Sequence, residues 1–117
     1  MTNYIQLPEP GRDATHLKIK LYYDLGGQNA WTYQQDARGY YLSVTPVKIE
    51  RRNGVTLESF VAFTGAKKCV KTVSRKSEKA AAQAAENAQN YIHDLALYVC
   101  NKNGLPVPAQ FIYTGEY

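Results

Sequence analysis

The amino-acid sequence predicts an α+β fold, in which a four-stranded antiparallel sheet precedes one long C-terminal amphipathic helix in the order ββββα. In residues 17–64, apolar and polar side chains alternate along several short runs, which is the period of a strand with one buried face. In residues 66–101, apolar side chains instead recur at steps of three and four, which places them on one face of a helix. The single domain therefore spans residues 17–104, between an N-terminal arm at residues 1–16 and a C-terminal tail or strap at residues 105–117.

The composition is that of an ordinary globular domain with an excess of tyrosine. A chain of 117 residues with 44% hydrophobic and 21% charged residues can bury a modest core. There is no apolar run of transmembrane length and no secretory signal pattern, so we expect a cytoplasmic protein. The net charge of +4 permits nucleic acid or an acidic protein surface as the partner. The ten tyrosines favour binding over catalysis, because tyrosine is common in sheets, interfaces and base-stacking platforms.

The first strand is expected at residues 17–23, where apolar residues alternate with Lys18, Lys20 and Tyr22. If the helix covers the apolar face, these three side chains lie on the solvent face, and Tyr41 from the third strand joins them. Lysines interleaved with tyrosines on such a face can bind single strands by charge and base stacking. The alternative is that the tyrosines are there only because they are good β-formers.

A short second strand is expected at residues 30–34, and a hairpin is expected from residues 40–52 and 55–63. Asn53 and Gly54 lie between the two runs and have the sequence of a two-residue type I′ turn. This turn fixes which residues of the two strands face each other.

The register set by that turn places Val47, Ile49 and Phe60 on the face opposite the other apolar residues of the hairpin. A bulge near Pro46 would rotate the outer half of the hairpin back toward the core. Without a bulge, the three side chains form a second apolar patch that binds a partner or another copy of the chain.

The tip of the hairpin carries positive charge from Lys48, Arg51 and Arg52. A protruding ribbon with such residues can enter a groove of nucleic acid or lie along its phosphates. Charged residues at a hairpin end also prevent unwanted pairing of strand edges, which is the alternative explanation.

The helix over residues 66–101 is expected to begin at Thr64 as its N-cap and to end at Gly104. A straight helix of roughly 36 residues is about 54 Å long. That length exceeds the width of a compact domain of this size, so the helix either overhangs its own core or packs in a homodimer. Cys69 and Cys100 would lie too far apart on this helix to form a disulfide, which fits a reducing compartment.

The expected start of the helix is strongly basic. The basic residues in this segment are Lys67, Lys68, Lys71, Arg75, Lys76 and Lys79. Cations in the first turns oppose the helix dipole and repel one another, so helix stability does not explain them. A phosphate backbone is one natural counterpart, because bound lysine and arginine release its condensed counterions. An acidic protein surface, or a simply solvated helix face, are the alternatives.

The sequence gives no indication of catalysis, a cofactor or a metal site. His93 and Asp94 are adjacent, so on a helix their side chains point about 100° apart and cannot form a dyad directly. The two histidines and two cysteines have no spacing that is typical of metal ligands. We therefore expect a binding protein, not an enzyme.

The chain contains Leu-Tyr-Tyr-x-x-Gly-Gly-x-Asn at residues 21–29, Arg-Gly-Tyr-Tyr-Leu-Ser-Val-x-Pro-Val at residues 38–47, Phe63-x-Gly65, Val73, and the run Arg75, Lys76, Ser77. Together these resemble a group of short open reading frames found in bacteriophages and conjugative elements of gut bacteria. The resemblance covers residues 17–80 and carries over no catalytic residue. It implies a small mobile-element protein in the cytoplasm of a bacterial host, where such proteins handle nucleic acid or block a defence such as a CRISPR effector. The strand order with a C-terminal helix is also similar to that of the Whirly single-strand binders, an analogy of fold alone.

Two functions follow as predictions. The first is contact with single-stranded DNA or duplex nucleic acid through the basic segment, the hairpin tip and the lysine-tyrosine face of the sheet. The alternative is an anti-CRISPR-like inhibitor that binds a host nucleic-acid-binding protein.

Overall fold

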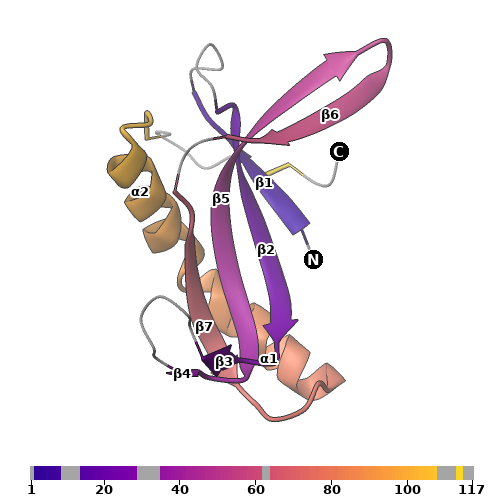
Figure 1. Ribbon diagram of the computed structural model, residues 1–117, viewed down its shortest axis with the longest axis vertical. Helices are drawn as coiled ribbons and strands as arrows, with labels where there is room; N and C mark the ends of the chain where they lie inside the picture. The colour runs from indigo at the N-terminus through magenta and orange to yellow at the C-terminus, as the bar shows by residue number, and fades with distance from the viewer. Residues whose placement is uncertain (1, 9–13, 29–34, 62–63, 108–112, 115–117) are drawn as a thin grey trace.

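The computed structural model describes residues 2–8, 14–28, 35–61, 64–107 and 113–114 of the chain. Within these residues the fold is α+β, as predicted, with one large antiparallel sheet, one small sheet and two helices (Figure 1). The predicted four-stranded sheet in ββββα order is wrong, because both ends of the chain and residues 66–72 add strands. The large sheet contains β1 (Thr2–Gln6), β2 (His16–Asp24), β5 (Gly39–Arg52), β6 (Val55–Phe60), β7 (Ala66–Thr72) and β8 (Tyr113–Thr114). The small sheet contains β3 (Gly27–Gln28) and β4 (Gln35–Asp36), and the helices are α1 (Glu78–Gln89) and α2 (Ile92–Asn103).

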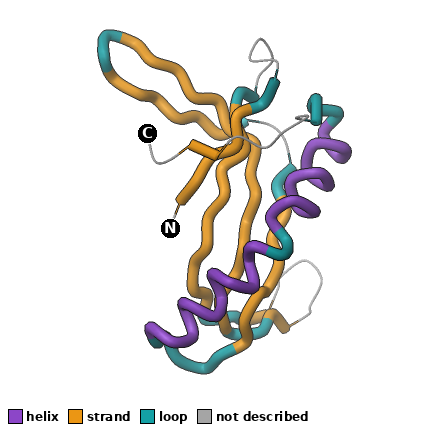
Figure 2. The backbone as a smooth tube through the Cα atoms, turned by 180° about the vertical axis from the view of Figure 1, so that it is seen from behind, coloured by secondary structure: helices purple, strands orange, loops and turns teal. Residues whose placement is uncertain are grey.

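The large sheet is built around β5, its longest described strand. One edge of β5 pairs with β2 from Gly39 to Val47. The other edge is shared, because β7 pairs with β5 from Gly39 to Val44 and β6 pairs with it from Val47 to Arg52. Past Val47, β6 is the one strand paired with β5 in the described residues, so the two project from the sheet as a two-stranded ribbon (Figures 1 and 2).

The hairpin turn and its register are confirmed. Asn53 and Gly54 both have positive φ angles, 52° and 77°, as a type I′ turn requires. Val47 faces Phe60 across the hairpin, and the pairing continues to the turn. The predicted return strand is too long, however, because β6 ends at Phe60. The pairing of β5 resumes with β7, where Ala66 faces Val44.

The bulge predicted near Pro46 is absent from β5, whose register with β2 runs through Pro46 without a shift. Val47 is nevertheless fully buried, at 0% exposure. The segment before β2 crosses it, since the Thr15 amide donates to the Val47 carbonyl (3.0 Å) and Thr15 Oγ1 accepts from the Ile49 amide (2.9 Å).

The single helix predicted at residues 66–101 is wrong over its first part. Residues 66–72 form β7, residues 73–77 connect it to α1, and the N-cap is Ser77, not Thr64. Ser77 Oγ accepts from the Ala80 amide (3.0 Å).

The sequence predicts a helix here because a spacing of four residues fits a helix, but four is also a multiple of the two-residue period of a strand. The apolar pair Ala66 and Val70 therefore fits the period of a strand as well as that of a helix. As a strand the segment pairs with the edge of β5, and Asn87 of α1 donates to the Val70 carbonyl (2.8 Å). These contacts satisfy the backbone hydrogen bonds of the segment. As a strand, the segment also avoids placing its lysines at the positive end of a helix dipole.

In the rest of the predicted helix, the buried face is correct, but the segment forms two helices and not one. The predicted apolar positions Ala84, Ala88 and Ile92 are buried. The helix is divided at residues 90–91, where the Tyr91 amide donates to the Ala88 carbonyl three residues back (3.0 Å). Each helix has 12 residues and is about 18 Å long, so the predicted overhang, and the argument for a dimer from it, no longer apply.

The predicted end of the helix is confirmed. Gly104 is left-handed, with φ 65°, and the Leu105 amide donates to the Cys100 carbonyl (2.9 Å). Leu105 is buried in the core, which provides the apolar contact that accompanies this type of helix C-cap.

Both ends of the chain contribute strands. The arm predicted at residues 1–16 contains β1, which pairs with β2, and its Ile5 and Leu7 belong to the core. The predicted tail contributes β8, which pairs with β1. The second strand predicted at residues 30–34 lies outside the described residues.

The helices cover one face of the large sheet (Figure 2). The core between them is formed by sheet residues such as Leu17, Ile19, Leu42 and Val44 and by helix residues such as Ala84, Ala88, Ile92, Ala96 and Val99. The small alanine side chains allow the helices to approach the sheet closely. The opposite face of the sheet, called the outer face below, is formed by Lys18, Lys20, Tyr22, Tyr41, Ser43, Thr45 and Lys67.

Candidate nucleic-acid interface

The outer face brings together residues from three strands. Tyr22 of β2 faces Tyr41 of β5, and the next row contains Lys20, Ser43 and Lys67 from β2, β5 and β7. The predicted shared face of the first and third strands is therefore present, and β7 extends it.

The two tyrosines on the outer face have different environments. Their rings are stacked, with centroids 6.0 Å apart and planes at 23°. Tyr41 is only 6% exposed, and its hydroxyl donates to the Ala37 carbonyl, so its ring supports Tyr22 and offers little surface to a base. Tyr22 is only partly buried. Of the two predicted stacking residues, Tyr22 is the one whose ring can meet a ligand.

Two lysines lie beside these rings. Lys20 Nζ is 5.9 Å from the Tyr22 ring centroid, and Lys67 Nζ is 5.4 Å from the Tyr41 centroid. Both are cation–π distances, and both residues are exposed. The ammonium groups are thus held next to the aromatic pair, where a phosphate group beside a stacked base would lie.

Lys18 has a structural role on the same face. Its Nζ lies 2.8 Å from Glu58 Oε1 of the ribbon, and the Tyr4 hydroxyl donates to Glu58 Oε2 (2.7 Å). Burial acts to raise the pKa of Glu58, but the hydrogen bonds from Lys18 and Tyr4 and the lysine charge outweigh it and lower that pKa. The charge of Lys18 is therefore largely neutralised within the fold.

The basic segment predicted at the helix start is distributed over three elements. Lys67, Lys68 and Lys71 are in β7, Arg75 and Lys76 are in the connection, and Lys79 is in α1. Because strand neighbours point to opposite faces, Lys67 lies on the outer face, whereas Lys68 Nζ lies 4.7 Å from the Tyr91 ring centroid at the helix break. The predicted single helical stripe does not exist.

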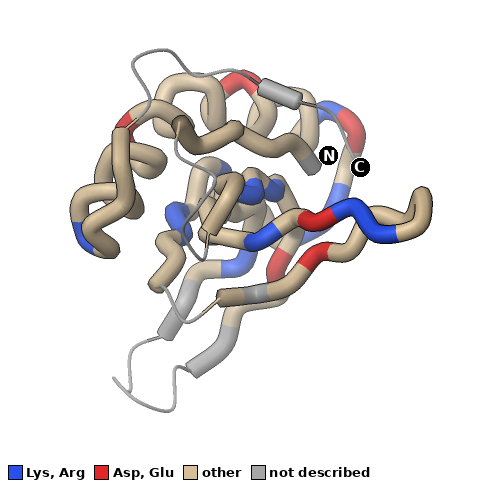
Figure 3. Tube along the Cα trace, turned by 90° about the horizontal axis from the view of Figure 1, so that it is seen from above, with Lys and Arg blue, Asp and Glu red and all other residues tan. Residues whose placement is uncertain are grey.

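Positive charge is nevertheless concentrated in the strands of the large sheet and not in the helices. Its strands contain eight basic residues, namely Lys18, Lys20, Lys48, Arg51, Arg52, Lys67, Lys68 and Lys71, against three acidic ones, namely Asp24, Glu50 and Glu58. The two helices contain Lys79 and Lys102 against Glu78, Glu86 and Asp94. Figure 3 shows Lys and Arg along the strands and the ribbon, whereas the helices are mostly uncharged.

The ribbon contains an ordered ion-pair row. Glu50 lies 2.8 Å from Lys48 Nζ and 2.9 Å from an Arg52 guanidinium nitrogen. The hydrogen bond from Lys48 and the charges of Lys48 and Arg52 lower the pKa of Glu50. Arg51 Nε donates to Thr56 Oγ1 (3.4 Å) on the other side of the ribbon.

The apolar patch predicted from Val47, Ile49 and Phe60 is wrong for Val47, which is fully buried. Ile49 is partly buried, and the side chain of Phe60 lies outside the described part of the structure. The exposed apolar residues of the ribbon are instead Val55 (57%) and Leu57 (45%). Sequence analysis missed them because the alternation of the hairpin does not show where the other strands stop.

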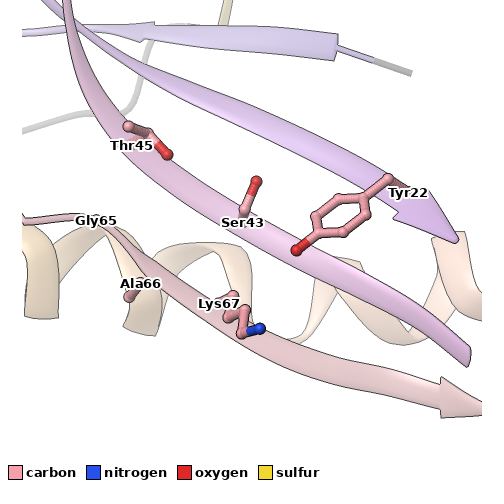
Figure 4. A pocket seen from close by; sticks show the side chains of 6 residues that line it. All are labelled: Tyr22, Ser43, Thr45, Gly65, Ala66 and Lys67. Carbon is pink, nitrogen blue, oxygen red and sulfur yellow. The ribbon is translucent and has the colours of Figure 1, made fainter. Parts of the chain in front are cut away.

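A hollow of about 270 Å³ lies on the outer face, lined by Tyr22, Ser43, Thr45, Gly65, Ala66 and Lys67 (Figure 4). Sequence analysis identified Tyr22 and Lys67 as binding residues but not the hollow between them. Its second wall is β7, which had been predicted as a helix.

Among the described residues, no group of three His, Cys, Asp or Glu side chains could hold a metal ion. His16 is buried with Nδ1 2.8 Å from Thr15 Oγ1, and burial lowers its pKa. Cys69 and Cys100 are free thiols, and burial raises the pKa of Cys100. No helix in the described ranges is long and apolar enough to cross a membrane.

No protein-family model matches the chain, and comparison with curated proteins and with solved structures gave no match.

Proposed function

We propose that the protein is a non-enzymatic nucleic-acid-binding protein that contacts a single strand through the outer face of its sheet. The observation that carries the proposal is the stacked pair of Tyr22 and Tyr41. Lys20 Nζ lies beside the Tyr22 ring, and Lys67 Nζ, from a different strand, lies beside the Tyr41 ring. Aromatic rings stack on bases of any sequence, and lysines neutralise the backbone that joins them.

The charge distribution supports the sheet over the helices, and Lys20 and Lys67 are the exposed basic residues that β2 and β7 place on its outer face. The large sheet has an excess of five basic residues over acidic ones, whereas the helices have one more acidic residue than basic. A phosphate backbone is attracted to the first surface and not to the second. The ribbon residues Arg51 and Arg52 are exposed and extend the basic surface beyond the sheet.

The test is fluorescence anisotropy of labelled single-stranded and double-stranded oligonucleotides, at about 50 mM and about 200 mM salt. If two or three phosphates are contacted, affinity for the single strand should fall roughly tenfold between these conditions. The double variant Lys20→Glu, Lys67→Glu should weaken binding by at least a further tenfold at the lower salt. The matched control is Lys79→Glu, Lys102→Glu, which makes the same change in net charge on the helices. Equal losses in the two variants would reject the outer face as the site.

The second candidate is the counter-defence inhibitor, and the observation that favours it is the ribbon. Its exposed Val55 and Leu57 lie beside an ordered row of charges, an arrangement suited to contact with a protein. This function predicts no oligonucleotide binding at either salt concentration, together with a stable complex with a bacterial nucleic-acid-binding protein that Leu57→Glu abolishes.

The resemblance to phage and conjugative-element reading frames supports either role and a site of action in the bacterial cytoplasm. The homodimer stays a prediction, and light scattering coupled to size exclusion measures it directly.

A further inference from the structure

The hollow on the outer face is built from three strands with different chemistry (Figure 4). Ser43 and Thr45 of β5 form its base, and the Tyr22 ring from β2 closes one side. The opposite side is formed by Lys67 and Ala66 of β7, together with Gly65 just before that strand.

The interruption between β6 and β7 creates this space. β6 ends at Phe60 and β7 begins at Ala66, so the edge of β5 at Thr45 has no strand partner on that side in the described residues. The chain returns to β5 at Gly65, where an added Cβ would lie 2.9 Å from the Val44 carbonyl oxygen and 3.1 Å from Thr45 Oγ1. Only glycine permits this approach without movement, and it leaves the space beside Thr45 open.

The position of Gly65 is fixed by α2. The side chain of Asn103 accepts from the Thr64 amide (2.9 Å) and donates to the Thr64 carbonyl (2.8 Å). The wall of the hollow is therefore anchored to the helices, and the space does not depend on an unsupported loop.

The lining is suited to an anion joined to a flat ring. Thr45 and Lys67 provide a hydroxyl group and an ammonium group that can donate hydrogen bonds to phosphate oxygens. The Ser43 hydroxyl donates to the Lys20 carbonyl (3.5 Å) and would rotate from it to join them. None of the six lining residues is acidic. Tyr22, on the other side, provides the aromatic surface that a base requires.

We infer that this hollow is the subsite for one nucleotide of the bound strand, with the base against Tyr22 and its phosphate between Lys67 and the hydroxyls of Ser43 and Thr45. The inference rests on the proposed nucleic-acid binding and names the residues that would contact one nucleotide of the strand. The volume of about 270 Å³ lies just below the usual range of ligand pockets, about 300–1,000 Å³, so the hollow holds no more than one nucleotide. The neighbouring nucleotides would lie outside it, toward Lys20 on one side and the ribbon on the other.

The first experiment is an amide NMR titration of the full chain with thymidine 5′-monophosphate. The amides of Thr45, Gly65, Ala66 and Lys67 should shift together and saturate, whereas those of α2 should not move. Thymidine without phosphate and inorganic phosphate alone should each give smaller shifts at the same concentration, because each occupies only part of the subsite.

The second experiment measures oligonucleotide affinity for three variants at about 50 mM salt. Tyr22→Leu removes the ring and should weaken binding at least fivefold, whereas Tyr22→Phe retains the ring and should bind nearly as the parent does. Thr45→Val removes a hydroxyl group at almost constant shape and should weaken binding roughly threefold. Its control is Tyr98→Phe, which removes a hydroxyl group from an exposed residue of α2 and should leave affinity unchanged.

The outcomes distinguish the inference from the function on which it rests. If the oligonucleotide binds with the expected salt dependence but Tyr22→Leu and Thr45→Val match the controls, the subsite is wrong and the nucleic-acid function stands. If the mononucleotide shifts the four amides but no oligonucleotide binds, the hollow is a nucleotide site and the proposed function is wrong. If neither ligand binds, both are rejected.

Discussion

The two halves of β5 belong to one continuous strand but have different environments. The inner half, from Gly39 to Val47, pairs on both edges for most of its length and has its apolar residues fully buried. The outer half pairs with β6 in the ribbon, where Val55 and Leu57 remain exposed. The comparison teaches that alternation shows which residues share a face. Whether that face is buried depends on how far the neighbouring strands and helices extend.

The largest expected effect comes from truncating one apolar side chain in each half. Leu42→Ala should lower the free energy of unfolding by about 2–5 kcal/mol, because Leu42 lies in the core between the sheet and the helices. Leu57→Ala in the ribbon should change it by less than about 0.5 kcal/mol. Urea unfolding followed by circular dichroism measures both values. Similar losses in the two variants would mean that the ribbon is packed as tightly as the sheet.

A smaller effect is expected at the contact that joins the two halves. Glu58 of the ribbon binds Lys18 and Tyr4 of the sheet, so Glu58→Gln should lower the free energy of unfolding by about 1 kcal/mol. Amide hydrogen exchange in β6 should become faster in the same variant, because the ribbon is less firmly held. Glu50→Gln is the control, since Glu50 pairs only with Lys48 and Arg52 within the ribbon. Unchanged exchange in Glu58→Gln would show that the ribbon is held by its backbone alone.

The pH dependence of stability tests the point where the ribbon leaves the sheet. His16 faces Val47 there, and burial holds its pKa in the folded state below the ordinary 6.5. The unfolded chain therefore takes up the proton first as the pH falls. Stability should be fully present above about pH 6.5 and decline as the pH drops through the folded-state pKa.

Urea midpoints between about pH 7.5 and about pH 5.5 measure this decline. His16→Gln should flatten it, while His93→Gln, at an exposed position on α2, should not. An equally steep decline in His16→Gln would assign the pH dependence to other groups.

Local signals were sufficient to predict a large part of the fold. The type I′ turn at Asn53 and Gly54 and the helix end at Gly104 follow from backbone angles that few residue types adopt easily. The shared face of Lys18, Lys20, Tyr22 and Tyr41 follows from alternation together with the antiparallel pairing of two strong strands. These features depend on residues close in sequence or on one well-marked turn.

Features that depend on distant partners could not be predicted. The segment of β7 satisfies both helical and strand periods, and only the unpaired edge of β5 decides between them. The hollow beside Gly65 required that pairing, and the sequence predicts only Tyr22 and Lys67 of its six lining residues. The contacts of Thr15 with Val47 and Ile49 at the base of the ribbon join residues far apart in sequence, and no local pattern indicates them.

The pairing of β8 with β1 has a consequence for the order of folding. Tyr4 and Thr114 face each other although they are about 110 positions apart, and closing such a loop in an open chain costs about 4 kcal/mol of entropy. Once Leu105 is docked in the core, only a short stretch separates it from Tyr113, and the cost falls to about 2 kcal/mol. We therefore expect this two-residue strand to join the sheet after α2 has docked, and a spectroscopic probe placed at Tyr113 would report completion of the fold.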